Sequence, residues 1–392
     1  MNQDSQRIIW GGISALVLTV GIARFAYTPL LPIMQAGVPG FSDADGGLLA
    51  AGNYIGYLSG AALAAHLHDI HLKDRLFRWG LVLALLTGTG MALTVNPWLW
   101  AVLRFFAGLS ASAGLVLCSG LVMHALLRHG DRPRMGLYFG GVGIGLAVAA
   151  IAVAIQSAWL DWREQWLALS VLGMPLAWLA HRWVPSPPRA IDAKPPQSGA
   201  ANSPKADPNR RRIRLLQAAY FCAGFGFVVS ATFLVDMLTS TPALQPIAPW
   251  AWVLVGLAAA PSCLFWERIG ARIGEVNALI RAWLAQIAGI LMTLPGHDAP
   301  VVLLGAFLFG FTFMGIVALV LTMVGHLYPA NPARPMGRLT LSFGFAQVIG
   351  PAIAGVMAEY SGSYAGPMLL ATGVLSVGLF PLLWLRNPGT GQ

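Results

Sequence analysis

The sequence predicts an all-α, polytopic membrane protein with twelve transmembrane helices arranged as two six-helix bundles. Of its 392 residues, 57% are hydrophobic and only 10% are charged, whereas soluble globular domains carry about 25% charged residues. Many apolar runs exceed the ~20 residues that a helix needs to cross a bilayer. The lysines and arginines also gather in alternate connecting segments. We therefore expect a chain that is surrounded by a lipid bilayer over most of its length.

The apolar runs divide the chain into twelve expected spans. They are too long and too continuous for barrel strands, which have about 10 residues of alternating character, so helices are expected. The first run is too long for the core of a signal peptide, so we expect it to be retained as a span. The expected spans are residues 8–34, 44–66, 76–95, 97–127, 135–158, 165–183, 213–237, 247–266, 276–294, 300–327, 336–360 and 364–385.

The basic residues predict the orientation of the chain. With the N-terminus inside, 20 of the 24 lysines and arginines fall in cytoplasmic segments, only Arg163 falls in an outer segment, and Arg24, Arg104 and Arg281 lie within spans. Cytoplasmic loops of membrane proteins carry such an excess of basic residues. Both termini are therefore predicted to be cytoplasmic. The net charge of +9 is interpreted as this topology signal, and no nucleic-acid partner is expected.

One segment in the middle of the chain has a different composition. Residues 185–212 are rich in Pro, Ser, Ala, Asn and charge, and such a segment cannot bury a core. This pattern predicts an N-terminal six-helix bundle at residues 1–184, a flexible cytoplasmic linker at 185–212 and a C-terminal six-helix bundle at 213–392.

The two predicted bundles also resemble each other. His124 near the end of span 4 precedes the letters RPRMG at 132–136, and His326 near the end of span 10 precedes RPMG at 334–337. Further matched pairs are Gly108 with Gly310 and Gly114 with Gly315. We interpret this as a parallel duplication of six spans. Such repeats are typical of transporters, with a substrate site between the halves near the midplane.

Six plus six helices joined by a cytoplasmic linker resemble the major facilitator superfamily. The segment GLAAAPSCLFWERIGAR at 256–272 resembles that family's loop motif, and HDIHLKDR at 68–75 keeps its charges without its glycine spacing. LRFFAG at 103–108 resembles the family's intramembrane arginine motif, and the glycines at 136–145 resemble its fifth helix. The resemblance implies gating contacts at the cytoplasmic ends of the helices. The residues of this sequence that would make these gating contacts are Asp69, Asp74, Arg75, Glu267, Arg268 and Arg272.

A narrower resemblance lies in span 1. The letters GIARFAYTPLLP at 21–32 are similar to the YbfB/YjiJ-like branch of the superfamily. The resemblance covers nearly the whole chain. It implies a transmembrane transporter that works by alternating access, located in the inner (plasma) membrane of a bacterium.

Two arginines within spans are the sharpest candidates for a binding site. Arg24 lies ten residues before Met34, about 15 Å below the predicted outer end of span 1. A cation at such depth costs about 2.5–3.5 kcal/mol on insertion scales, which favours a functional role. Tyr27 and Thr28 share its helix face. Arg104 in span 4 is expected at similar depth. The alternative for both arginines is structural, with the guanidinium clamping a backbone carbonyl or packing between helices.

The acidic residues provide no buried partner for these cations. Asp236 and Glu359 lie near the outer ends of spans 7 and 11, and the first half has no acid in the middle of a span. Two buried cations without a buried anion favour an anionic small-molecule substrate, held by the guanidinium groups. Transport could be coupled to the movement of a proton or another ion, and the candidates for binding it are Asp236, Glu359 and a histidine.

Other polar side chains within spans are weaker candidates for substrate contacts, because polar groups at these positions also make packing hydrogen bonds. They are Asn53, Tyr54, Tyr57, Tyr138, Tyr220 and Gln347.

The sequence favours secondary transport over other functions. The chain contains no phosphate-binding loop and no pattern typical of a catalytic or metal site, so no enzyme activity, cofactor or metal is expected. Two alternatives remain at this point. One is an exporter of hydrophobic compounds, and the other is a membrane sensor that shares the fold without transporting.

Overall fold

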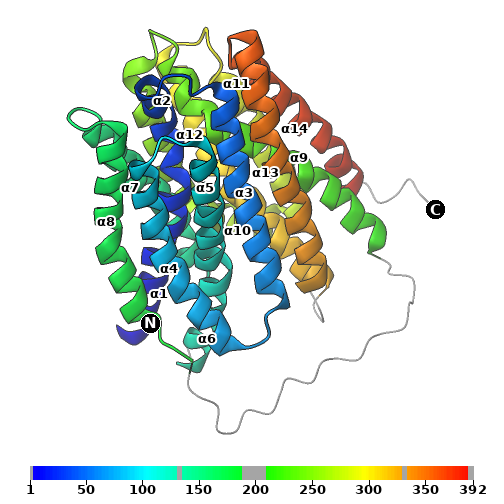
Figure 1. The fold of residues 1–392 in the computed structure, drawn as a ribbon. Helices are drawn as coiled ribbons and strands as arrows, with labels where there is room; N and C mark the ends of the chain where they lie inside the picture. Colours follow the sequence, from blue (N-terminus) through cyan, green and yellow to red (C-terminus); the bar gives the residue numbers. More distant parts are fainter. Residues whose placement is uncertain (1–2, 130–134, 188–208, 329–332, 387–392) are drawn as a thin grey trace.

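The computed structural model describes residues 3–129, 135–187, 209–328 and 333–386. Figure 1 shows a bundle of long helices that run side by side between two ends of the molecule. The first half contains α1 (Gln3–Leu16), the π-helix η1 (Val17–Phe25), α2 (Tyr27–Gly37), α3 (Asp43–His66), α4 (Ile70–Leu93), α5 (Pro97–Ser112), the π-helix η2 (Ala113–Leu117), α6 (Cys118–Arg128), α7 (Met135–Gln156) and α8 (Trp162–Trp183). The second half contains α9 (Arg210–Thr239), the short 3-10 helix η3 (Gln245–Ile247), α10 (Ala248–Ile273), α11 (Glu275–Met292), α12 (Ala299–Leu327), α13 (Ala333–Ser361) and α14 (Ala365–Arg386).

The twelve predicted spans are confirmed as helices. Within the described residues, eleven helical stretches are long and apolar enough to cross a membrane, and α8 is the twelfth, with polar residues near each end. Spans 1 and 4 are not single α-helices, because η1 and η2 interrupt them. We refer to the end with the loops at 38–42, 157–161 and 362–364 as the outer end, following the predicted orientation, and to the opposite end as the cytoplasmic end.

Several predicted boundaries were wrong, because helices continue beyond the apolar runs. α4 begins at Ile70 rather than at residue 76, since Asp69 accepts a hydrogen bond from the backbone N–H of His71 and caps the helix. α10 continues to Ile273, beyond the predicted end at 266. α9 begins at Arg210, inside the predicted linker at 185–212. The central part of that linker, residues 188–208, lies outside the described residues.

The outward faces of the helices are strongly apolar. Trp79 is 64% exposed, Leu93 75% and Phe380 65%. In water, such surfaces would drive association, but lipid tails are as apolar as leucine. Since the helices satisfy their own backbone hydrogen bonds, these faces are suited to contact with the bilayer.

The two halves meet mainly along two helix pairs, with a smaller contact between α2 and α9. α7 packs against α10, and α3 packs against α13. Glycine permits the close approach of the first pair, because a Cβ atom at Gly256 would lie 2.3 Å from the backbone nitrogen of Ala147. The predicted duplication is consistent with the packing inside each half. Gly108 of α5 contacts the backbone of α3, and its counterpart Gly310 of α12 contacts the backbone of α10.

Polar caps fix where the helices begin at the outer end. Ser42 and Asp45 form a capping box at the start of α3, in which each side chain accepts a hydrogen bond from the other residue's backbone N–H. Asp161 and Glu164 form the same motif at the start of α8. Such caps stabilise a helix by ~1 kcal/mol, and the first one places Asp43 at the boundary between the halves.

Candidate functional site

The irregular backbone of span 1 positions Arg24. In η1 the helix widens, so that the N–H of Ala26 donates to the carbonyl of Gly21, five residues earlier, at 2.9 Å. Pro29 has no N–H and cannot donate to a carbonyl of the preceding turn. Carbonyl groups near the junction of η1 and α2 are therefore left without helical donors. π-helical turns of this kind occur often at functional sites.

Arg24 is buried among aromatic rings without an anionic partner. Its side chain is 6% exposed, and its Cζ atom lies 4.4 Å from the ring centroid of Tyr54, 4.5 Å from that of Tyr57 and 5.0 Å from that of Phe25. Within the described residues, its Nε atom is buried and has no hydrogen-bond partner, and neither ion pair found there involves it. Ring faces attract a cation, and the Tyr54 side chain also makes a hydrogen-bonding contact with Arg24, but the described part of the chain places no carboxylate within ion-pair distance of the guanidinium.

Arg104 is also buried, and its Nε likewise has no hydrogen-bond partner within the described residues, but its two Nη atoms have backbone partners. Its Nη1 donates to the carbonyl of Ala23 at 3.0 Å, and its Nη2 donates to the carbonyl of Arg24 at 3.1 Å. The ring of Tyr27 covers its guanidinium at 4.4 Å. Arg104 therefore provides donors to the carbonyls at the end of η1. This is the clamping role that the sequence analysis gave as the structural alternative. Because Arg104 holds the backbone carbonyls of Ala23 and Arg24, it helps to fix where Arg24 lies.

Replacing Arg104 with methionine is expected to destabilise the protein without first removing a substrate contact. Two carbonyls would lose a charged donor, and hydrogen bonds to charged groups contribute about 1.5–3 kcal/mol each. The melting temperature in detergent should fall by several degrees, while Arg281→Met, on the exposed face of α11, should leave it unchanged. An Arg104→Met variant that melts like the wild type but no longer binds ligand would contradict this role.

Three other candidates also form hydrogen bonds with the backbone. The hydroxyl of Tyr27 donates to the carbonyl of Gly46 at 2.9 Å, and Nδ2 of Asn53 donates to the carbonyl of Arg104 at 3.0 Å. The hydroxyl of Thr28 donates to the carbonyl of Ala231 in α9 at 2.6 Å and so links the two halves. These contacts hold spans 1, 2, 4 and 7 together around Arg24.

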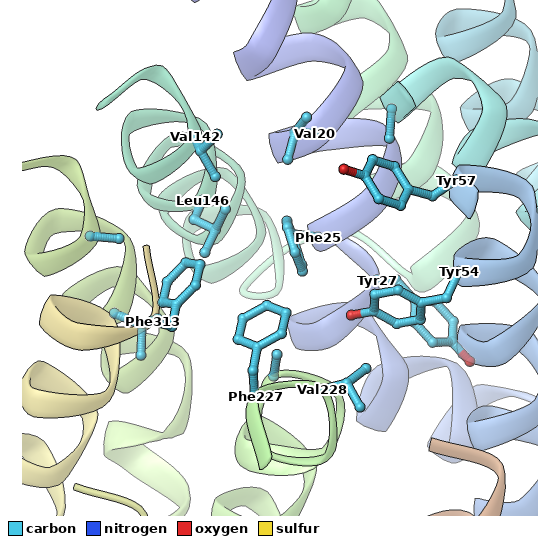
Figure 2. Packing of buried hydrophobic residues seen from close by; sticks show 14 of the residues in the cluster. Val20, Phe25, Tyr27, Tyr54, Tyr57, Val142, Leu146, Phe227, Val228 and Phe313 are labelled. Carbon is cyan, nitrogen blue, oxygen red and sulfur yellow. The ribbon is translucent and has the colours of Figure 1, made fainter. Parts of the chain in front are cut away.

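The second half packs two aromatic rings against Phe25, the neighbour of Arg24. Phe25 lies 6.3 Å, between ring centroids, from both Phe227 of α9 and Trp252 of α10. Figure 2 shows Phe25 beside Phe227, whose rings meet edge to face, with Tyr54 and Tyr57 on the other side of Phe25. Tyr220, another candidate, stacks on Phe343 at 4.4 Å. Aromatic rings from both halves therefore pack together around Phe25.

Gln347 of α13 carries a buried polar atom without a hydrogen-bond partner among the described residues, at the contact between α13 and α3. It is 2% exposed, and within the described residues its Oε1 has no hydrogen-bond partner. Gly344 and Pro351, on the same face of α13, approach Leu58 and Gly47 of α3. Helical spacing thus places Gln347 toward the middle of α3.

Tyr138 lies apart from this group. Its side chain is fully buried inside the first half, and its hydroxyl donates to the carbonyl of Gly114 in η2 at 2.5 Å. It supplies a donor to the second π-helix, much as Arg104 does to the first. We therefore leave Tyr138 out of the site proposed below.

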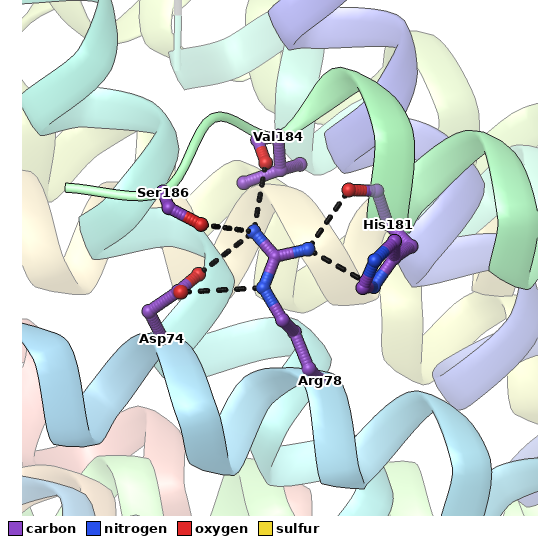
Figure 3. A network of polar contacts seen from close by, with 5 residues as sticks. All are labelled: Asp74, Arg78, His181, Val184 and Ser186. Atoms are coloured by element: carbon purple, nitrogen blue, oxygen red, sulfur yellow. Dashed lines mark hydrogen bonds and ion pairs between the residues drawn. The ribbon is translucent and has the colours of Figure 1, made fainter.

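Of the predicted gating residues, Asp69 caps the start of α4 and the other five lie on α4 and α10. Asp74 pairs with Arg78 at 3.1 Å, one turn away on α4. Arg78 also donates to the carbonyls of His181 and Val184 and to the hydroxyl of Ser186, as Figure 3 shows. This network joins α4 to the end of α8 and to the first residues of the predicted linker.

The remaining gating candidates are exposed. Arg75 on α4 and Glu267, Arg268 and Arg272 on the last turns of α10 form no ion pair within the described residues. The carboxylate of Glu267 lies near Gly136 of α7, 3.6 Å from where a Cβ atom of that glycine would be. The acidic group of the loop motif thus lies beside the other half.

Solved structures with this fold support the architecture. The nucleoside transporter NupG, in a point-mutant form, matches with a TM-score of 0.75 at 15% identity, over 96% of this chain and 99% of that one. The human organic anion transporter MFSD10 (TETRAN) matches with a TM-score of 0.64 at 17% identity, over 97% of this chain and 100% of that one. At such identities the likeness establishes the fold alone.

Sequence relatives identify the family. The uncharacterised transporter mfc1 of Schizosaccharomyces pombe (strain 972 / ATCC 24843) is 31% identical over 124 residues, which span 31% of this chain and 25% of that protein. The family model described as uncharacterised MFS-type transporter YbfB matches residues 16–382. That range covers nearly all of the twelve helices. This chain therefore belongs to the YbfB family of transporters within the major facilitator superfamily, and it is an integral membrane protein.

Proposed function

We propose that this protein carries a small organic anion with an apolar body across the membrane by alternating access, and that Arg24 binds the anionic group. The observation that carries the proposal is a buried guanidinium at the interface of the halves with no anionic partner among the described residues and an unsatisfied Nε. A buried charge is costly unless it is paired and hydrogen-bonded. A carboxylate would provide both the charge and the acceptors, in a bidentate geometry that suits arginine.

The surroundings of Arg24 define the rest of the substrate. Tyr54, Tyr57 and Phe25 cover the guanidinium from the first half, and Phe227 and Trp252 continue the aromatic surface in the second half. Aromatic faces favour an apolar or aromatic body over a highly hydroxylated one, which would leave its polar groups unpaired. The polar contacts proposed for the substrate are Tyr57, Asn53, Tyr220 and Gln347.

The moving units proposed for alternating access are the two bundles, at residues 1–184 and 213–392, joined by the segment 185–212. The fold occurs in a protein described as a nucleoside transporter and in one described as an organic anion transporter. Fold alone does not choose between such substrates. The choice of an anion here rests on Arg24.

The proposal is tested by thermal unfolding of the purified protein with matched pairs of compounds. Each aromatic or aliphatic carboxylate is compared with its primary amide, which has nearly the same shape without the charge. A ligand at about 100 times its dissociation constant stabilises the folded state by about 2.7 kcal/mol. We expect carboxylates to raise the melting temperature and their amides to do so only at much higher concentration.

Flux into proteoliposomes then distinguishes the alternatives. Uptake of the stabilising carboxylate would support anion transport. Stabilisation by the amides alone would favour the exporter of hydrophobic compounds, because a neutral ligand does not need Arg24. Binding of a carboxylate without any flux would favour the sensor.

A further inference from the structure

A polar contact closes the outer end of the molecule between the two halves. Tyr364, in the turn between α13 and α14, lies between Asp43, the first residue of α3, and Asp236 of α9. The hydroxyl oxygen of Tyr364 is 2.6 Å from Oδ1 of Asp43 and also contacts Oδ2 of Asp236. Asp236 and Tyr364 are 6% and 7% exposed. One carboxyl group from each half thus meets at a single hydroxyl.

The number of hydrogens in this contact indicates a bound proton. A tyrosine hydroxyl has one hydrogen and can donate to only one carboxylate, while ionised carboxylates can only accept. The second contact of the Tyr364 oxygen therefore needs a hydrogen from a carboxyl group. Gln35 donates to Oδ1 of Asp43 at 2.7 Å and also contacts Asp236. Asp236 is the more buried of the two carboxyl groups, at 6% exposure against a partly exposed Asp43, and an uncompensated charge is costlier at the more buried position. The consistent arrangement has Asp236 protonated and donating to Tyr364, which donates to Asp43.

The neighbouring groups offer no positive charge that could replace this proton. Asp45 is held in the capping box of α3, and Glu359 of α13 accepts a hydrogen bond from the backbone N–H of Ala44 at 3.2 Å. Toward the centre of the molecule, Arg104 is covered by the ring of Tyr27 and donates to carbonyls of η1. No ion pair to any of these acids is found in the described part of the chain.

The hydroxyl itself is a stable donor. Tyr364 lies in a loop, where its burial, together with the two carboxylates beside it, raises its pKa. It therefore keeps its hydrogen throughout the physiological range, and any proton that is gained or lost belongs to the carboxyl groups.

We propose that Asp43, Tyr364 and Asp236 form a proton-operated latch between the two halves of the transporter. With one proton shared by the two carboxyl groups, the outer end is closed. When that proton leaves, two negative charges from opposite halves face one hydroxyl, and the outer end opens. Since the closed form binds one proton more than the open form, low pH favours closure. Each opening of the outer end would thus release a proton, which links the cycle to proton movement whatever the substrate is.

The latch is tested by measuring the distance across the outer end at different pH values. Spin labels are attached to Trp159→Cys and His297→Cys, which lie in exposed outer loops of the two halves. The background carries alanine at Cys118, Cys222 and Cys263, and the protein is in lipid nanodiscs without substrate. From about pH 5 to about pH 9, we expect the ratio of open to closed populations to rise by up to about tenfold per pH unit, the limit for one proton.

Three variants make the result specific. Asp236→Asn keeps a donor and an acceptor but has no titrating proton, so its distance should stay short at every pH. Tyr364→Phe removes the bridge and should open the outer end at lower pH. Glu359→Gln, an adjacent acid outside the latch, should keep the wild-type response. A pH-independent wild type, or a response that survives Asp236→Asn, would overturn the latch, whereas failure of anion binding would leave it untouched.

Discussion

Replacing Arg24 with alanine is expected to abolish anion binding while leaving the unliganded protein at least as stable as the wild type. Removing one partner of a buried charge pair costs about 2–5 kcal/mol of binding, which corresponds to affinity lowered by about 30-fold to 4,000-fold. The unliganded protein should not suffer, because the guanidinium has no ionic partner among the described residues and is itself costly to insert, by about 2.5–3.5 kcal/mol.

Thermal unfolding with and without the carboxylate measures both effects in one series. Arg24→Lys keeps the charge without the planar fork and should retain part of the binding. Arg281→Ala is the control for loss of an exposed arginine. If Arg24→Ala still responds to the carboxylate like the wild type, the anion is bound elsewhere. The opposite pattern expected for Arg104→Met, lower stability before any loss of binding, separates the two arginines.

Replacing Gly108 with valine is expected to be the most destabilising single change in the first bundle. A Cβ atom at Gly108 would lie 1.9 Å from the carbonyl oxygen of Asn53, and one at Gly56 would lie 1.9 Å from that of Phe105. These contacts involve backbone on both helices, so α3 and α5 would have to separate. Overpacking costs about 1–3 kcal/mol and sometimes more, and the separation would also disturb the contacts of Asn53 and Arg104.

The melting temperature should fall by about 5–10 °C, since 1 kcal/mol corresponds to about 2–4 °C for a domain of this size. Gly120→Val is the matched control, because no atom of the described residues lies within 4 Å of a Cβ atom at that position of α6. Equal melting temperatures for the two variants would mean that α3 and α5 are not packed as closely as described. Gly310→Val should resemble Gly108→Val, because a Cβ atom there would meet the carbonyl oxygen of Val255 at 2.3 Å.

The fold could be predicted from the sequence because lipid leaves the backbone few alternatives. Apolar runs of the right length, basic residues in alternate segments and repeated landmarks each depend on composition and spacing, which a sequence displays directly. The ends of α4 and α10 were missed because a helix can continue into water on polar residues. There, a cap at Asp69 matters more than hydropathy.

The candidate site could be predicted only in part. The depth of Arg24 and Arg104 is readable from the apolar runs that contain them, but their hydrogen-bond partners are not. A continuous apolar run does not reveal a π-helix, so the carbonyls that Arg104 satisfies were invisible in the sequence. Phe25 was missed because an aromatic residue in a span resembles any other packing residue. Tyr364 was missed because it lies in a turn, and only the fold brings it to Asp236.

The π-helix η1 also determines the direction in which span 1 presents its side chains. Its wider turn accommodates more residues than an α-helix would over the same length. Each residue of a regular helix turns the chain by about 100°. Deleting one residue between Val17 and Gly21 would let the segment wind as an ordinary helix and would rotate Arg24 away from Tyr54 and Tyr57. The proposed binding charge is thus placed by the count of residues that precede it, so a shortened span 1 would keep every side chain of the proposed site and is still expected to lose anion binding.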